Sequence, residues 1–264
     1  MSSQPKHIVW IASYPKSGNT WLRFLTCNLV FGGIDTAAKL DWFAPDLHEL
    51  RGTVNLPAQR VFMKTHFPYS AALPLGERSA AAIYVVREPG DVMLSNYHYA
   101  KRTAAVTDDG EAAFTRYVDA FIAAGGDPRW LELQMGSWES NIRSWIDSPP
   151  PFPVLRIRYE DMLEDGCKVA RALCDFLGIR RTPEAIRAAV EGASFERMRA
   201  IEEADIQAQR AGIFFKPHLQ KSIAAGLRFM RRGTSGGADG MMSDDQRRRF
   251  DAVFGAPRRR LGYA

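Results

Sequence analysis

The chain has 264 residues, 46% of them hydrophobic, and a formal net charge of +5 at pH 7. This composition excludes global disorder, and the modest positive charge suits a small anionic ligand better than a nucleic acid, which selects a denser basic stripe. No apolar run approaches the roughly 20 residues of a membrane span, and the first six residues lack the apolar core of a signal peptide. The three cysteines have no C-x-x-C spacing and the five histidines are scattered. We therefore expect free thiols, no metal site, and a cytoplasmic protein without membrane or nucleic-acid partners.

The first predicted elements are a strand, a loop and a helix. Ile8–Ile11 form a short apolar run typical of a buried strand in a parallel sheet. From position 21 onward, apolar residues recur with helical spacing at Leu22, Leu25 and Leu29. The loop between these elements, YPKSGNT, contains Gly18, which permits a backbone path that is closed to other residues.

The loop YPKSGNT has the properties of an anion-binding site. A glycine-bearing loop that opens a helix directly after a strand presents free N–H groups at the positive end of the helix dipole. Lys16 adds a full positive charge, and Ser17, Asn19 and Thr20 add polar side chains, so a phosphate is the simplest ligand. The order of residues is not that of the nucleotide-triphosphate loop, in which the lysine follows the second glycine. The alternative is that this loop binds no ligand and is only a tight turn with an exposed lysine.

Further strands and helices follow in the order expected of a parallel sheet covered on both faces, and hence of an α/β fold. Apolar runs predict strands at 61–65, 81–86 and 153–159. Periodicity and capping residues predict helices at 89–102, 111–124, 138–146, 169–177, 183–191 and 244–254. Residues 32–57 are expected to be irregular. Weak patterning from 207 to 226 predicts a lid or loop region over the site, roughly 207–240, within one domain that covers 1–264.

Chemically distinctive side chains follow two of the predicted strands. Ligands of open α/β sheets bind outside the carboxyl ends of the strands. This rule places Lys64 and His66, at the end of the second strand, beside the loop that contains Lys16. Arg87 closes the third strand, where its guanidinium fork suits a phosphate. The alternatives are that His66 has a purely structural role and that Arg87 is paired with a nearby carboxylate.

Residues 14–21, YPKSGNTW, resemble the 5′-phosphosulfate loop of the cytosolic-type sulfotransferases. Other family-like segments follow in the same order at 64–66, 87–95, 159–161, 194–198 and 231–236. The resemblance covers most of the chain and is nearest to bacterial sulfotransferases that modify secondary metabolites such as glycopeptides. It implies a single-domain, three-layer α/β/α fold of the P-loop-NTPase-like sulfotransferase type, with a central, mainly parallel sheet. It also implies metal-free transfer of a sulfuryl group from 3′-phosphoadenosine 5′-phosphosulfate (PAPS) to a hydroxyl of a small metabolite or peptide natural product.

The resemblance further implies roles for individual residues. His66 is expected to be the general base, for which an ordinary pKa near 6.5 is well suited, while Lys16 stabilises the leaving group and Lys64 acts on the sulfuryl oxygens. The 5′-phosphate is expected to bind the backbone of Ser17, Gly18, Asn19 and Thr20. The 3′-phosphate is expected to bind Arg87, Ser95, Arg231, Arg232 and Gly233. The adenine is expected to contact Trp21, Tyr159, Phe195 and Phe229.

The last of these segments departs from the family pattern R-K-G-x-x-G-D-W. The basic pair, Arg231 and Arg232, and both glycines are present, but Gly237-Ala238 replaces Asp-Trp. A downstream dimerisation motif has no match, so a monomer and a dimer both stay open. The alternative functions are an ATP-dependent, kinase-like phosphotransferase, a non-catalytic nucleotide-binding protein and a purely structural protein. The first of these predicts a Walker order of loop residues and a metal-binding acid at a strand end, and neither is evident.

Overall fold

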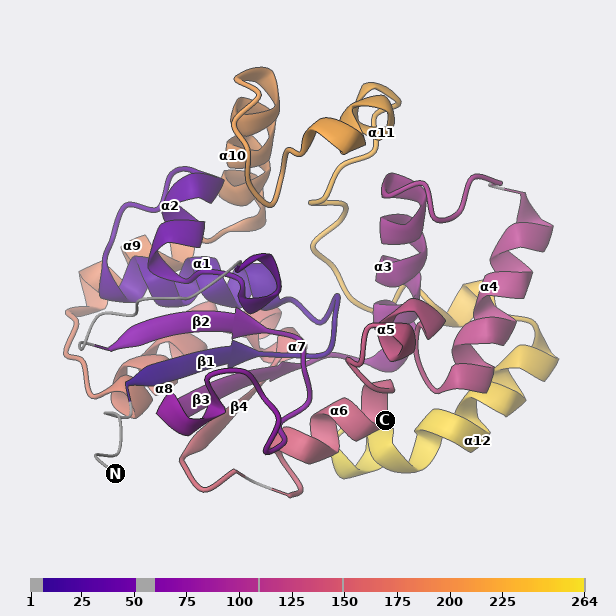
Figure 1. Cartoon of the computed structure of the whole chain (residues 1–264), viewed down its shortest axis with the longest axis horizontal. Coiled ribbons are helices and arrows are strands. Elements are labelled where there is room, and N and C mark those ends of the chain that lie inside the picture. The colour runs from indigo at the N-terminus through magenta and orange to yellow at the C-terminus, as the bar shows by residue number, and fades with distance from the viewer. Residues whose placement is uncertain (1–6, 51–59, 109, 149, 264) are drawn as a thin grey trace.

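The computed structural model describes residues 7–50, 60–108, 110–148 and 150–263. A four-stranded parallel sheet in the order β2-β1-β3-β4 lies at its centre (Figure 1). The strands are β1 (Ile8–Ala12), β2 (Val61–Thr65), β3 (Ser79–Val86) and β4 (Val154–Arg158). All four predicted strands are confirmed, with ends that differ by at most two residues. Residues 1–6 lie outside the described residues, and so do residues 51–57 of the region that was predicted to be irregular.

The register of the strands brings their carboxyl ends to one edge of the sheet. Ala12, the last residue of β1, pairs with Thr65 of β2 and with Tyr84 of β3. Val86, the last residue of β3, pairs with Arg158 of β4. The segments that follow the four strands therefore meet at this edge, as the strand-end rule predicts for a ligand site.

Helices cover both faces of the sheet (Figure 1), which confirms the predicted three-layer α/β/α class. One face packs against α1 (Asn19–Val30), α2 (Ala37–Phe43), α7 (Tyr159–Glu164), α8 (Gly166–Leu177), α9 (Pro183–Gly192) and α10 (Phe195–Gln207). The other packs against α3 (Pro89–Arg102), α4 (Glu111–Ala124), α5 (Pro128–Glu132), α6 (Trp138–Trp145) and α12 (Asp244–Arg260). Among the described residues, none of the helices combines the length and apolarity that a membrane crossing requires.

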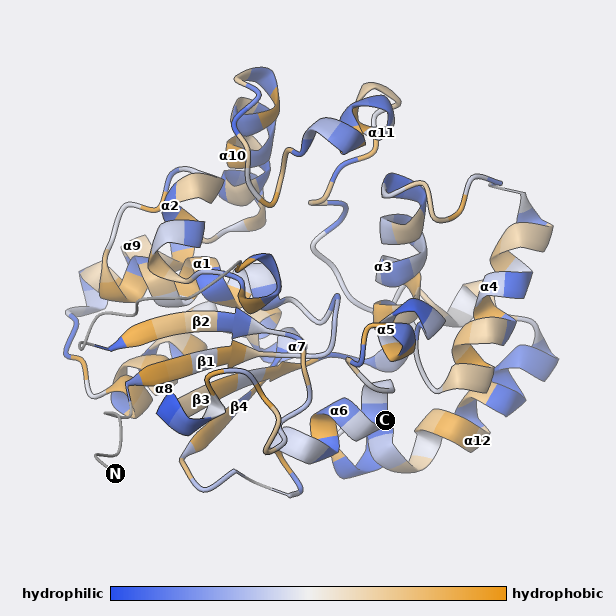
Figure 2. Ribbon diagram, viewed as in Figure 1, coloured by the Kyte–Doolittle hydropathy of each residue, from blue (hydrophilic) through white to orange (hydrophobic). Residues whose placement is uncertain are grey.

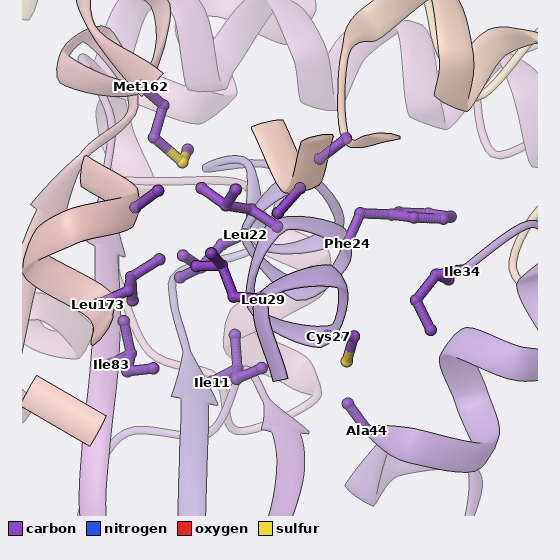
Figure 3. Close-up of a cluster of buried hydrophobic side chains, with 14 of the residues drawn as sticks. Ile11, Leu22, Phe24, Cys27, Leu29, Ile34, Ala44, Ile83, Met162 and Leu173 are labelled. Carbon is purple, nitrogen blue, oxygen red and sulfur yellow. The ribbon is translucent and has the colours of Figure 1, made fainter. Parts of the chain in front are cut away.

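Alternate residues of β1 enter two separate hydrophobic clusters, because successive side chains of a strand point to opposite faces. Ile11 packs with Leu22 and Leu29 of α1 in the cluster shown in Figure 3. Ile8 and Trp10 belong to the cluster on the other face. Burial on both faces explains why β1 is continuously apolar, as its orange colour shows in Figure 2. The loop after β1 is thereby held between a buried strand and a buried helix.

Two regions predicted as loops contain short helices. Residues 32–57 include α2 and a 3-10 turn at Leu47–Glu49, with Thr36 capping α2 by accepting from the N–H of Lys39. The segment 207–226 includes a 3-10 turn at Pro217–Leu219 and, after it, α11 (Gln220–Ala224). Elements of three to seven residues are too short to produce a recognisable periodicity, which is why the sequence did not indicate these short helices.

The last helix continues past its predicted end at Phe254 and finishes at Arg260. Pro257 lies inside it and, in the sequence, resembles a helix stop. The guanidinium of Arg258 lies 3.1 Å from the carboxylate of Glu88, at the start of α3. This ion pair joins the final turn of α12 to the start of α3.

Candidate active site

A cavity of about 950 Å³ opens at the carboxyl edge of the sheet. Ser17 alone among the predicted site residues does not line it; its side chain is buried, and its Oγ has no hydrogen-bond partner among the described residues. The cavity brings together all the other predicted residues, namely Lys16, Gly18, Asn19, Thr20, Trp21, Lys64, His66, Arg87, Ser95, Tyr159, Phe195, Phe229, Arg231, Arg232 and Gly233.

The loop after β1 leaves the start of α1 open to an anion. Gly18 caps the helix with a left-handed backbone (φ +100°), and no described side chain accepts a hydrogen bond from the first turn. The first N–H with an acceptor inside the helix is that of Leu22, which donates to the Gly18 carbonyl at 3.1 Å. The N–H groups of residues 19–21 have no intrahelical acceptor and can bind a phosphate.

Two glycines allow the backbone to approach aromatic rings closely. A Cβ on Gly18 would lie 2.5 Å from the ring of Tyr159, and one on Gly233 (φ +66°) would lie 2.4 Å from the ring of Phe195. Trp21 meets Tyr159 edge to face, with the ring centroids 5.3 Å apart. The loop after β1 and the segment around Gly233 are therefore each packed against a ring that the sequence assigns to the adenine.

Lys16 lies between two aromatic rings. Its Nζ is 4.4 Å from the ring centroid of Tyr99 and 4.2 Å from that of Phe229, which the sequence had assigned to the adenine. Burial, followed by the charges of Arg102 and Arg87, lowers the pKa of Lys16 from 10.5 to about 7. A bound anion favours the protonated ammonium and raises this pKa again.

His66, the first residue after β2, has a defined orientation. Its Nδ1 lies 2.8 Å from the carbonyl oxygen of Ser13, which can only accept, so Nδ1 carries the proton and Nε2 the lone pair. Its backbone N–H donates to Nε2 of His48 at 2.9 Å. Burial, followed by the charge of Lys64, holds the pKa of His66 well below 6.5. The ring is neutral at pH 7, and the expectation of an ordinary histidine pKa is corrected.

Lys64 is ion-paired. Its Nζ lies 2.5 Å from Oδ2 of Asp46, and both side chains are mostly buried. A paired ammonium has less charge to offer to a sulfuryl group than the sequence-based role requires. Asp46 lies in the region that was predicted to be irregular, and nothing in its local pattern pointed to a partner on β2.

Arg87 follows β3 and packs against an aromatic ring. Its guanidinium carbon lies 4.0 Å from the ring centroid of Tyr159, and its Nη2 donates to the Thr234 carbonyl at 2.9 Å. A longer contact of 3.8 Å joins it to Asp91, so the ion pair considered as the structural alternative is present. Its Nε is buried and has no hydrogen-bond partner among the described residues. Ser95, two turns along α3, lines the same cavity.

Two buried carboxylates hold residues 229–237, which we call the basic segment, at its two ends. Glu202 of α10 accepts from two consecutive backbone N–H groups at the first end, at 2.6 and 2.8 Å. Asp91 of α3 accepts from two more at the other end, at 3.0 and 3.1 Å. Arg231 and Arg232 lie between these anchors. Sequence reasoning missed Glu202, because a glutamate in a polar helix gives no local signal of burial.

Sequence reasoning also missed Asn141 of α6, which is 0% exposed. Its Nδ2 donates to the carbonyls of His66 at 2.8 Å and of Met135 at 2.7 Å. Its Oδ1 accepts from the hydroxyl of Tyr84 at 2.6 Å, and this hydroxyl accepts from the backbone N–H of Tyr14 at 3.2 Å. The loop after β1 and the segment after β2 are thus joined to α6 by one buried network.

Comparison with known proteins identifies the family. The family model described as "Sulfotransferase domain" matches residues 6–262, so the chain belongs to this family and is a sulfotransferase. It is 29% identical to Sulfotransferase 1A1 of Canis lupus familiaris over 266 aligned positions, which cover 96% of this chain and 83% of that protein. It is 27% identical to Sulfotransferase 2A1 of Rattus norvegicus, with 92% and 82% covered.

Solved structures share the fold. The structure of mouse sulfotransferase SULT7A1 complexed with PAP superposes with a TM-score of 0.67 at 22% identity, over 97% of this chain and 84% of that one. The structure of retinol dehydratase in complex with androsterone and PAP gives a TM-score of 0.70 at 17% identity, over 97% and 82%. The predicted sulfotransferase fold is confirmed.

Proposed function

We propose that this sulfotransferase moves the sulfuryl group of PAPS to a hydroxyl of a small acceptor. The observation that carries the proposal is that one cavity holds cationic groups from the loop after β1, from the end of β3 and from the basic segment, together with the neutral His66. The solved structures of similar fold, which contain PAP, the desulfated form of this donor, support the choice of nucleotide.

The unpaired polar groups of the cavity fit PAPS. The N–H groups of residues 19–21, next to Lys16, suit the 5′-phosphate. The guanidinium of Arg87, which lines the cavity, and the anchored basic segment suit the 3′-phosphate. A Cβ on Gly18 or Gly233 would displace a neighbouring ring, so both glycines fit a role in shaping this cradle.

The proposed chemistry is an in-line transfer. As the acceptor oxygen attacks sulfur, its proton moves to Nε2 of His66; the new O–S bond forms, and the bond from sulfur to the bridging oxygen breaks. The electron pair of that bond stays on the 5′-phosphate of the nucleotide, where Lys16 stabilises the charge. Lys64 is given a smaller part, because Asp46 already neutralises it.

The acceptor is proposed to be a small metabolite or peptide natural product, as in the bacterial sulfotransferases that the sequence resembles. Retinol dehydratase, a structure of similar fold, was solved with androsterone and with retinol. Residues 207–240 are proposed to form a lid on one domain. Their Lys216 lies 2.7 Å from Glu49, which supports contact between this segment and the opposite wall of the cavity.

Two measurements test the proposal. Calorimetry should detect binding of PAP that is much tighter than binding of ATP with Mg²⁺; the reverse order would favour a kinase-like activity. A panel of hydroxyl compounds incubated with PAPS that carries labelled sulfate should contain products heavier by one labelled sulfuryl group, read by mass spectrometry. PAP binding without any such product would indicate a nucleotide-binding protein without catalysis.

A further inference from the structure

Arg102, the last residue of α3, is a buried cation in the wall of the cavity. It is 2% exposed, and its Nη2 donates to the carbonyl of Phe214 at 2.7 Å. Its Nε is buried and has no hydrogen-bond partner among the described residues. A buried charge is costly unless it is paired, so the surroundings of this guanidinium need an explanation.

Among the described arginines whose Nε is buried and unpartnered, Arg102 differs in having no ion pair. The arginines with a buried, unpartnered Nε are Arg23, Arg78, Arg87, Arg102, Arg158 and Arg258. All of them except Arg102 form an ion pair with a described carboxylate. Burial lowers the pKa of Arg102 below its usual value, against the more distant attraction of Glu202. Its positive charge is therefore left without a direct counter-ion from the described residues.

Arg102 lies near Lys16, at the end of the cavity where the proposed transfer takes place. Its guanidinium carbon lies 5.7 Å from the ring centroid of Phe229, the ring that the ammonium of Lys16 approaches to 4.2 Å. The carbonyl that it binds, that of Phe214, belongs to the proposed lid. Arg102 thus lies where the loop after β1 and the proposed lid approach each other, and the proposed function assigns it to neither phosphate of the nucleotide. Trp130 also lines this cavity and adds aromatic surface.

We propose that Arg102 binds an anionic group of the acceptor, such as a carboxylate or a sulfate or phosphate ester, so that the preferred acceptor is a hydroxyl compound that also carries an acid. A guanidinium matches the geometry of such groups and forms strong, charge-assisted hydrogen bonds with them. This inference rests on the proposed sulfuryl transfer and adds the chemical class of the acceptor.

The test compares acids with neutral molecules of nearly the same shape. The enzyme saturated with PAP is titrated by calorimetry with 2-, 3- and 4-hydroxybenzoate and with their methyl esters. At least one acid should bind about tenfold or more tightly than its ester. Arg102→Gln keeps a hydrogen-bond donor for Phe214 but carries no charge. It should weaken the binding of that acid about 10–100-fold and the binding of its ester less than about threefold. Arg102→Lys should restore part of the preference.

Arg116→Gln is the matched control, because Arg116 is exposed on α4 and lies outside the cavity lining. It lowers the net charge equally and should keep the preference for the acid. The inference is overturned if the wild-type enzyme prefers none of the acids over its ester. It is also overturned if Arg102→Gln loses affinity equally for acid and ester, which would assign Arg102 to the lid or to donor binding. If Arg102→Gln does not fold, an unchanged preference in Arg102→Lys, which lacks the guanidinium fork, overturns it.

The affinity for PAP alone separates this inference from the proposed function. Tight PAP binding without acid preference refutes only the acidic acceptor, whereas absent PAP binding refutes the proposed sulfuryl transfer.

Discussion

Nδ1 of His66 lies 2.8 Å from the carbonyl oxygen of Ser13, so the loop that leads to Lys16 also orients the proposed base. The two residues directly follow neighbouring strands, whose last residues, Ala12 and Thr65, pair in register. Because the carbonyl can only accept, the ring must accept a proton through Nε2. The orientation of the base is therefore a consequence of the register of the sheet.

Removal of the imidazole should abolish most turnover. His66→Ala is expected to lower kcat about 10²–10⁴-fold, which is the usual contribution of a general base. The affinity for PAP should stay close to that of the wild type, because the proposed phosphate contacts lie elsewhere. Steady-state assays with PAPS and calorimetry with PAP measure the two effects. His98→Ala, in a histidine outside the cavity lining, is the control; near-normal turnover of His66→Ala would reject the role.

Loss of the buried amide should separate catalysis from nucleotide binding. Asn141→Leu leaves the His66 carbonyl and the Tyr84 hydroxyl without this partner, which should cost about 1–3 kcal/mol of unfolding free energy. A displaced base should lower kcat about 10–100-fold at an unchanged PAP affinity. Ser144→Ala, on the same helix, removes the acceptor of the Tyr69 N–H and should lower stability but not kcat. An unchanged kcat in Asn141→Leu contradicts the positioning role.

Nucleotide binding should weaken as the pH rises. The pKa of Lys16 is about 7, because burial and neighbouring cations disfavour the charged form, and a bound phosphate raises it. Between about pH 7 and pH 9 the complex holds more protons than the free enzyme, so binding takes up a proton and weakens by up to about tenfold per pH unit. Calorimetry of PAP in buffers of different ionisation enthalpy measures this uptake. Lys16→Met should abolish it, and a proton-neutral wild type would contradict the assignment.

Two glycines with left-handed backbones make a matched pair. Gly18→Ala adds a Cβ 2.5 Å from the ring of Tyr159 at φ +100°, whereas Gly32→Ala (φ +73°) meets no described atom within 4 Å. Both should lose about 1–2 kcal/mol of stability from the backbone conformation, measured by urea unfolding. Only Gly18→Ala should also lose PAP affinity, by about tenfold or more, because the clash moves the phosphate loop. Equal PAP affinities in the two variants would show that the close approach does not matter for binding.

The guanidinium after β3 should discriminate between nucleotides. Arg87→Ala is expected to weaken the binding of PAP about 10–100-fold and the binding of adenosine 5′-monophosphate much less, because only PAP carries the 3′-phosphate. Arg158→Ala, at the end of β4 but outside the cavity lining, should affect neither. Calorimetry with both nucleotides decides, and equal losses would remove Arg87 from the 3′ site.

The sheet and several of the charged residues that line the cavity could be predicted from sequence, because they depend on local patterns. Apolar runs located the strands, and the rule that ligands bind at strand ends placed Lys16, His66 and Arg87 in one site, whose lining includes all three. The motif-based resemblance added Tyr159 and the basic segment, which no periodicity could have marked as a site.

The partners of these residues could not be predicted, because pairing across distant segments leaves no local pattern. Asp46 neutralises Lys64 from a region that appeared irregular. Glu202 and Asn141 occur among polar residues and look like surface positions, yet both are 0% exposed. The perturbed pKa of Lys16 likewise depends on charges that only the fold brings near.

The two anchors of the basic segment have a consequence for the energetics of recognition. Since Glu202 and Asp91 already hold both ends of this stretch, its conformational entropy is lost during folding rather than on ligand arrival. The proposed site of the 3′-phosphate is thus preorganised, so nucleotide affinity should not be reduced by the cost of ordering this segment. In the proposed function, Glu202 therefore favours the binding of an anion despite its own negative charge, because it restricts the backbone next to the two arginines.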